Sequence, residues 1–252
     1  MHLAPDPPLP IPVHAGGTGA APLGFRSGQL EALKWIALAS MLVDHLGRHL
    51  LGIGQETWVF AAGRLAFPLF AGVLGMNLAR PGDRSARASR TTRKLVLWGA
   101  VAVLPSVWAR GQPAMVNVLA TLALGVAIVW VLEAGGPVLP RLLGCVVAGA
   151  AGQFAEFGTG GVLLVPAVFL ACTRPGLALP AALLFLCTAW LNAQYGGLWG
   201  LLGTLAAVPV VLLARALPVS APRWPALFYV GYPVHLAVIG WLRNSGVALP
   251  WS

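Results

Sequence analysis

Asp44 and His45 are adjacent ionisable residues near the end of an apolar segment, Leu33–Gly47. Placing an aspartate at the centre of a membrane helix costs about 2.5–3.5 kcal/mol, so the pair predicts a functional site. An imidazole titrates near neutral pH and can accept a proton from an amine or a hydroxyl nucleophile. We therefore interpret His45 as a general base; the alternative is a histidine that only forms a hydrogen bond between helices.

Asp44 does not share a helix face with His45, because consecutive residues lie about 100° apart around an α-helix. We expect its carboxylate to pair with Arg64 in the next apolar segment or with Arg48, four residues later. A structural ion pair and a direct catalytic role both remain open for Asp44. Arg64 can hold this carboxylate, stabilise a developing oxyanion, or extend to the membrane interface.

Asn117 and His235 are two further polar residues in apolar surroundings. The Asn117 amide can donate to a carbonyl or an oxyanion, or it can form a hydrogen bond between helices. His235 follows Tyr232 and Pro233, so it either lines a cavity or satisfies a carbonyl freed by the proline. His49 lies four residues after His45, a spacing seen in metal sites. Without an HExxH motif or a clear acidic third ligand, we expect no metal site.

A basic segment from Arg80 to Lys94 separates two apolar runs, and we interpret it as a loop. The segment contains one acidic residue, Asp83. Its basic residues are Arg80, Arg84, Arg87, Arg90, Arg93 and Lys94. Positively charged loops stay on the cytoplasmic side of a membrane, which is one explanation for this segment. Arginine also binds phosphate groups with two hydrogen bonds, so docking of an anionic cofactor such as coenzyme A is the other.

The composition indicates an integral membrane protein in contact with a lipid bilayer. Of the 252 residues, 58% are hydrophobic and 9% charged, and the mean hydropathy is +0.80. Soluble domains carry roughly 25% charged residues. The formal charge of +9 does not indicate nucleic-acid binding, because most basic residues lie between apolar runs. The three cysteines lie within apolar runs and predict neither a disulfide set nor a metal site.

The expected fold is an all-α, polytopic helical bundle of about nine transmembrane helices, with eight or ten also possible. The apolar runs predict spans near residues 30–50, 57–79, 94–110, 115–134, 138–155, 160–173, 177–192, 196–216 and 225–243. Residues 1–27 are rich in proline and glycine and predict a disordered leader, and residues 28–252 form the transmembrane domain.

The basic segment fixes the expected orientation, with a cytoplasmic N-terminus. Alternating passes then bring several polar groups into the outer half of the membrane: Asp44, His45, Arg64, Asn117, Glu156 and Asn192. We expect these groups to converge on one polar cavity, while the opposite side carries mainly arginine and lysine.

Four segments of the chain resemble the TraX family of bacterial inner-membrane proteins. They are residues 33–47, 63–71, 117–125 and 228–236, and they occur in the family order. TraX is associated with N-acetylation of the amino terminus of conjugative pilin. The family is also similar to a wider group of transmembrane acyltransferases, including heparan-α-glucosaminide N-acetyltransferase, in which a histidine near the extracytoplasmic side is implicated in transfer from cytoplasmic acetyl-CoA.

The resemblance implies a multi-pass inner-membrane acyltransferase that uses acetyl-CoA. His45 matches the family's Asp-His pair, Arg64 its Arg-Leu-Ala-Phe-Pro motif and His235 its Tyr-Pro-x-His segment. We expect transfer of an acetyl or other acyl group to an amine or hydroxyl of a pilin, peptide, glycan or lipid. His45 would act as base, with Asp44, Arg64 and Asn117 beside it; the basic segment and His235 would bind the cofactor. A membrane transporter and a structural component of a conjugation or secretion system are the rival interpretations.

Overall fold

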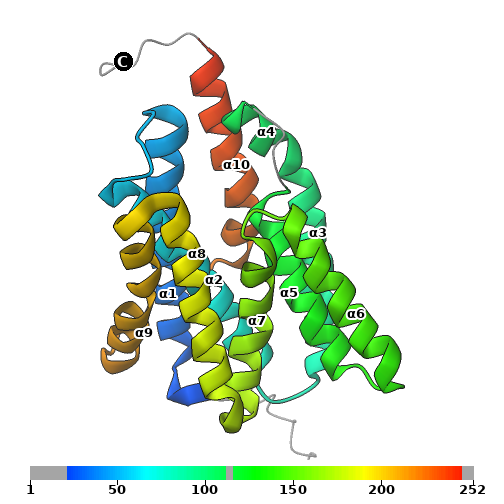
Figure 1. Ribbon diagram of the computed structural model, residues 1–252. Helices are drawn as coiled ribbons and strands as arrows, with labels where there is room; N and C mark the ends of the chain where they lie inside the picture. Colours follow the sequence, from blue (N-terminus) through cyan, green and yellow to red (C-terminus); the bar gives the residue numbers. More distant parts are fainter. Residues whose placement is uncertain (1–21, 112–115, 246–252) are drawn as a thin grey trace, which may run out of the picture.

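The computed structural model describes residues 22–111 and 116–245, and its regular elements are helices (Figure 1). Residues 1–21, most of the predicted leader, lie outside the described residues. The α-helices are α1 (Ser27–His45), α2 (Trp58–Leu78), α3 (Arg84–Val101), α4 (Val103–Arg110), α5 (Val118–Glu133), α6 (Val138–Ala151), α7 (Gly158–Thr173), α8 (Ala178–Leu205), α9 (Ala207–Ala216) and α10 (Pro225–Asn244). Short helical turns, including a π-helix η2 (Leu46–Leu50) and a 3-10 turn η3 (Gly152–Phe154), join some of them.

The helices run between two ends of the bundle. We call the end that holds Ser27, Arg80 and Arg215 the basic end. In Figure 1, α1 begins and α9 ends at the bottom of the view, which is this end. The end that holds His45, Glu156 and Arg243 is the histidine end. Helix α1 joins the two, and its 18-residue rise from Ser27 to His45 corresponds to about 27 Å at 1.5 Å per residue. That length is close to the ~30 Å hydrocarbon core of a bilayer.

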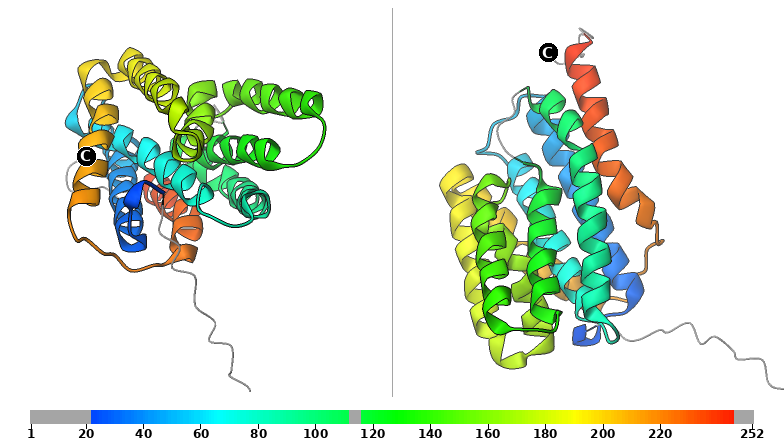
Figure 2. Two further views of the ribbon diagram at one scale, coloured as in Figure 1. Left: turned by 90° about the horizontal axis from the view of Figure 1, so that it is seen from below. Right: turned by 90° about the vertical axis from the view of Figure 1, so that its right-hand side faces the viewer.

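Nine passes connect these two ends within the described residues, in agreement with the order of the predicted spans. They are α1, α2, α3 with α4, α5, α6, α7, the first part of α8, the second part of α8 with α9, and α10 (Figures 1 and 2). The sequence patterns therefore gave the order of the passes, because each apolar run is bounded by glycine, proline or charged residues that end a helix. The third pass begins ten residues earlier than predicted, at Arg84.

Helix α8 reverses direction at Gly196 and Gly197, which separates two predicted spans. Gly197 has a φ of 53° and a ψ of −139°, a conformation that favours glycine. The side chain of Asn192 donates to Thr204 Oγ1 at 2.8 Å. Twelve residues of straight helix would hold these groups about 18 Å apart, so the chain must fold back between them.

The predicted loop from Arg80 to Lys94 is wrong for most of its length. Helix α3 begins at Arg84, directly after Asp83, whose Oδ1 accepts a hydrogen bond from Ala86 N at 2.8 Å. Aspartate is a favoured residue before a helix, and it satisfies a backbone N–H of the first turn. The connection from α2 is therefore only residues 79–83, and most of the basic residues lie on the first three turns of α3.

Large apolar side chains cover much of the outside of the bundle. Helix α6 lies at the edge against α5 and α7 and exposes Val138, Leu139, Val146 and Val147 by 65–67% (Figure 2). By length and composition, the described segments 58–78, 175–216 and 225–244 are suited to cross a membrane; 118–133, 138–154 and 158–173 are shorter apolar helices. An exposed apolar surface of this extent indicates contact with lipid.

Candidate active site

His45 and His235 form a direct pair at the histidine end. Nδ1 of His45 lies 2.6 Å from Nε2 of His235, and the two ring planes are within 15° of parallel, with centroids 5.0 Å apart. His45 is 6% exposed and comes from the last turn of α1, whereas His235 comes from the middle of α10. The pair joins residues that are 190 positions apart in the sequence. His235 thus lies with the predicted base, not with the basic residues with which sequence analysis grouped it.

The backbone of α10 holds the second ring of this pair. Nδ1 of His235 lies 2.7 Å from the carbonyl oxygen of Gly231, one turn earlier in the same helix. Pro233 lies between these two residues. Of the two interpretations of His235, this contact supports a hydrogen bond to a backbone carbonyl. The carbonyl is that of Gly231, however, whereas the carbonyl that Pro233 leaves without its helical partner is that of Tyr229.

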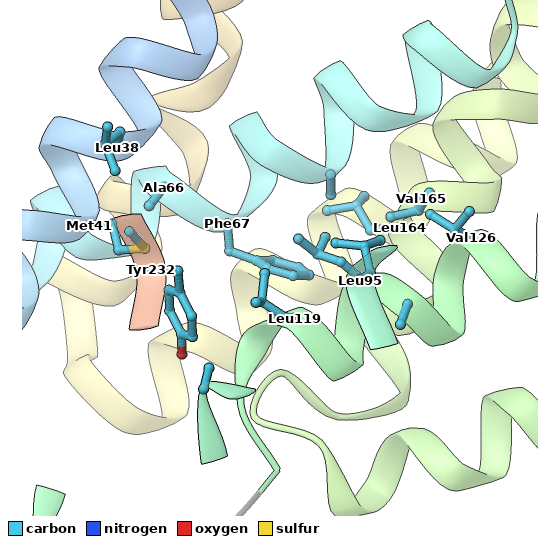
Figure 3. Close-up of a cluster of buried hydrophobic side chains, with 14 of the residues drawn as sticks. Leu38, Met41, Ala66, Phe67, Leu95, Leu119, Val126, Leu164, Val165 and Tyr232 are labelled. Atoms are coloured by element: carbon cyan, nitrogen blue, oxygen red, sulfur yellow. The ribbon is translucent and has the colours of Figure 1, made fainter. Parts of the chain in front are cut away.

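Tyr232 is a buried neighbour of both histidines that sequence analysis did not identify. Its ring centroid lies 6.2 Å from that of His45 and 5.6 Å from that of His235. Figure 3 shows its ring near Met41, Phe67 and Leu119, where it belongs to the main apolar cluster of the bundle. The histidine pair therefore lies directly beside the packed core, which restricts the positions that its rings can adopt.

Asp44 forms the ion pairs that its position predicts. Its Oδ2 lies 3.5 Å from Nη1 of Arg48 and 3.6 Å from Nη2 of Arg64. The carboxylate also packs against the backbone of Gly63, where a Cβ would overlap it. Glycine at position 63 is therefore what lets α1 and α2 approach closely enough for the Asp44–Arg64 pair to form.

Arg64 lies between two aromatic rings instead of extending to an interface. Its guanidinium carbon is 4.6 Å from the ring centroid of Phe60 and 5.2 Å from that of Phe157. Phe157 in turn stacks on Phe67 with ring centroids 3.9 Å apart. A guanidinium held by a carboxylate and two aromatic faces has a fixed position, which suits a charge that stabilises a neighbouring group.

A second ion pair completes this end of the molecule. Nη2 of Arg110, at the end of α4, lies 2.8 Å from Oε2 of Glu156, between η3 and α7. Both side chains are less than one-fifth exposed. Of the six groups predicted to converge, Asp44, His45, Arg64 and Glu156 lie at this end, together with Arg110. The polar cavity that they were expected to line remains a prediction.

Asn117 and Asn192 have other contacts. Oδ1 of Asn117 accepts from Leu119 N at 3.1 Å, and its Nδ2 donates to the carbonyl of Gly99 at 2.8 Å. Asn117 therefore begins α5 and ties it to α3. Asn192 pairs with Thr204 across the turn of α8. These backbone partners are sufficient to explain why the Asn117 amide is buried. The oxyanion role expected of Asn117 remains a prediction.

The basic residues lie toward the opposite end of the bundle, where their helical part extends about 15 Å along α3, and they divide into two groups. Arg87 donates to the carbonyls of Arg80 and Pro81 at 2.7 and 2.8 Å, so it closes the connection after α2. Nη1 of Arg84 lies 3.9 Å from Oε2 of Glu133, and Nη2 of Arg80 donates to Oγ of Ser27 at 3.4 Å. The remaining cations of the segment are exposed on α3; they are Arg90, Arg93 and Lys94.

A small cavity of about 150 Å³ is also located at the basic end. Arg26, Gln29 and Arg215 are among the residues that line it. With the exposed cations of α3, it gives this end a surface suited to phosphate groups. Among the described residues, no group of three histidine, cysteine or acidic side chains could hold a metal ion.

Comparison with known proteins identifies relatives over most of the chain. A family model described as TraX protein matches residues 29–243. Protein TraX of Escherichia coli is 31% identical over 230 residues, which cover 86% of this chain and 88% of the relative. Protein TraX of Escherichia coli strain K12 is 47% identical over 60 residues, 23% of each chain. No solved structure matches the chain significantly.

Proposed function

The chain belongs to the TraX family, and from this premise we propose that it is a membrane-embedded acetyltransferase. The observation that carries the proposal is the buried His45, held by His235 at the end of the bundle opposite the exposed cations of α3. A single chain thereby offers a base at one end and a phosphate-binding surface at the other. This separation is what acetyl transfer from a cytoplasmic donor to an acceptor on the far side of a membrane requires.

The nine passes of the bundle are proposed to cross the bacterial inner membrane. The basic end would face the cytoplasm, because positively charged connections remain on that side. The histidine end would then lie in the outer half of the membrane. The nucleotide of acetyl-CoA would bind Arg90, Arg93 and Lys94, and its extended arm would bring the thioester toward His45.

His45 is proposed to act as a general base in direct transfer to an acceptor amine. Its Nε2 takes the proton that the amine nitrogen loses as this nitrogen forms a bond to the thioester carbonyl carbon. The carbon–sulfur bond then breaks, and the proton passes from His45 to the leaving thiolate, which gives an amide and a free thiol. Arg64 would stabilise the negative charge that develops on the thioester carbonyl oxygen after the carbon–nitrogen bond forms and before the carbon–sulfur bond breaks. A hydroxyl acceptor would follow the same steps.

Labelled acetyl-CoA tests this proposal directly. We expect the purified protein in detergent to transfer the label to at least one acceptor in a panel of a pilin-like peptide with a free amino terminus, an amino sugar and an amino lipid. A lack of transfer to every class, together with flux of solutes in liposomes, would instead identify a transporter.

Replacing the exposed cations of α3 is expected to weaken donor binding. We expect the triple variant Arg90→Gln, Arg93→Gln, Lys94→Gln to raise KM for acetyl-CoA about tenfold, the effect of losing ~1.4 kcal/mol of binding, with kcat little changed. Arg174→Gln is the matched control, because it removes an exposed cation outside α3. If KM rises by the same factor for each charge removed in both variants, only the net charge matters and the proposed site on α3 is wrong.

A further inference from the structure

We propose that His235 is a positioning residue that keeps His45 in the one tautomer able to act as base through Nε2. The proposal deepens the proposed function and rests on it for its catalytic consequence. Its structural part concerns only which ring nitrogens of His45 and His235 carry protons. These positions can be measured without an acetyl donor or an acetyl acceptor.

The Gly231 carbonyl decides the protonation of the second ring. A carbonyl oxygen only accepts hydrogen bonds, so the 2.7 Å contact requires a proton on Nδ1 of His235. A neutral imidazole carries one proton, which leaves Nε2 of His235 as an acceptor.

This acceptor then decides the protonation of the first ring. Nε2 of His235 lies 2.6 Å from Nδ1 of His45, so Nδ1 of His45 must carry the proton and donate it. The lone pair of a neutral His45 is therefore on Nε2, the ring nitrogen that faces away from His235. One backbone carbonyl thus sets the tautomer of a residue on another helix through an intermediate imidazole.

The carboxylate next to His45 in the sequence does not perform this task. Asp44 is directed at Arg48 and Arg64, and consecutive helix residues point in different directions. A neutral imidazole has an advantage as the partner in an apolar segment, because a carboxylate placed there would add a buried charge. When His45 takes up a proton, its Nδ1–H still donates to His235 and the bond becomes charge-assisted.

Nitrogen NMR of histidine-labelled protein in detergent tests the assignment. We expect wild-type His45 to carry its proton on Nδ1 and His235→Leu to lose this preference, because leucine offers no acceptor. We expect His235→Gln to retain the preference, since its amide oxygen can replace Nε2. His49→Leu is the matched control: that ring centroid is 5.5 Å from His45, and we expect its removal to leave the tautomer unchanged.

Kinetics provide the second measurement. We expect His235→Leu to lower kcat about 10- to 100-fold, as loss of an orienting partner does at other sites, with KM for the donor unchanged and partial rescue in His235→Gln. A proton on Nε2 of wild-type His45, or an unchanged tautomer in His235→Leu, would overturn the proposal. The expected NMR result in a protein that transfers no acetyl group would leave the pairing intact and refute only the acetyltransferase function.

Discussion

His45→Ala is expected to lower kcat for acetyl transfer by about 10²- to 10⁴-fold, the usual contribution of general acid–base catalysis. The substitution removes the proposed base, and neither His235 nor Asp44 is placed to replace it. His235 points its Nδ1 at the Gly231 carbonyl, and Asp44 is held by two arginines. Transfer of labelled acetyl groups by the purified variant is the measurement, with KM for acetyl-CoA expected to remain unchanged because the donor nucleotide binds at the other end.

The control for this variant must separate catalysis from folding. His49→Ala removes a ring next to His45 with which it shares no hydrogen bond, and we expect it to retain most of the activity. His45→Gln keeps a polar side chain of similar length at the position and should stay inactive. Turnover by a folded His45→Ala protein close to that of the wild type would exclude His45 as the base.

The passes of the chain were predictable because their signals are local. Apolar runs between charged and glycine- or proline-containing connections located each pass, and an aspartate four residues before Arg48 indicated the ion pair. The convergence of Asp44, His45, Arg64 and Glu156 followed from counting alternate passes. The start of α3 at Arg84 was missed although its signal was present, since Asp83 is a favoured residue before a helix.

The histidine pair could not be predicted from these patterns. The relative position of α1 and α10 depends on packing between segments 190 residues apart, and no local periodicity records it. The same limit applies to Arg110 and Glu156, which come from different helix ends. Asn117 was expected to face a reacting group because it is polar within apolar surroundings. Its contacts with Leu119 and Gly99 show that a helix start buries the same residue type for a structural reason.

Asp44→Ala is expected to destabilise the protein by about 3–5 kcal/mol, the usual cost of removing one partner of a buried ion pair. The side chain of Asp44 is 5% exposed and that of Arg64 is 12% exposed, so the change leaves an uncompensated guanidinium between Phe60 and Phe157. Arg48 contributes less to this cost, because its side chain is 27% exposed and can turn toward solvent. Thermal unfolding in detergent measures the effect as a lowered Tm.

Removing both partners shows whether the instability of Asp44→Ala comes from the unpaired buried charge of Arg64 or from the loss of the contact itself. We expect Asp44→Ala with Arg64→Leu to unfold at a higher temperature than Asp44→Ala alone, since the double variant buries no unpaired charge. A double variant that is less stable than either single variant would contradict this account of the pair.

The structural and the catalytic interpretation of Asp44 predict different activities for Asp44→Asn. The test is to measure kcat of this variant below its unfolding temperature. A structural carboxylate leaves kcat of the folded fraction largely intact, whereas a group that acts on the substrate lowers kcat even where the protein is fully folded.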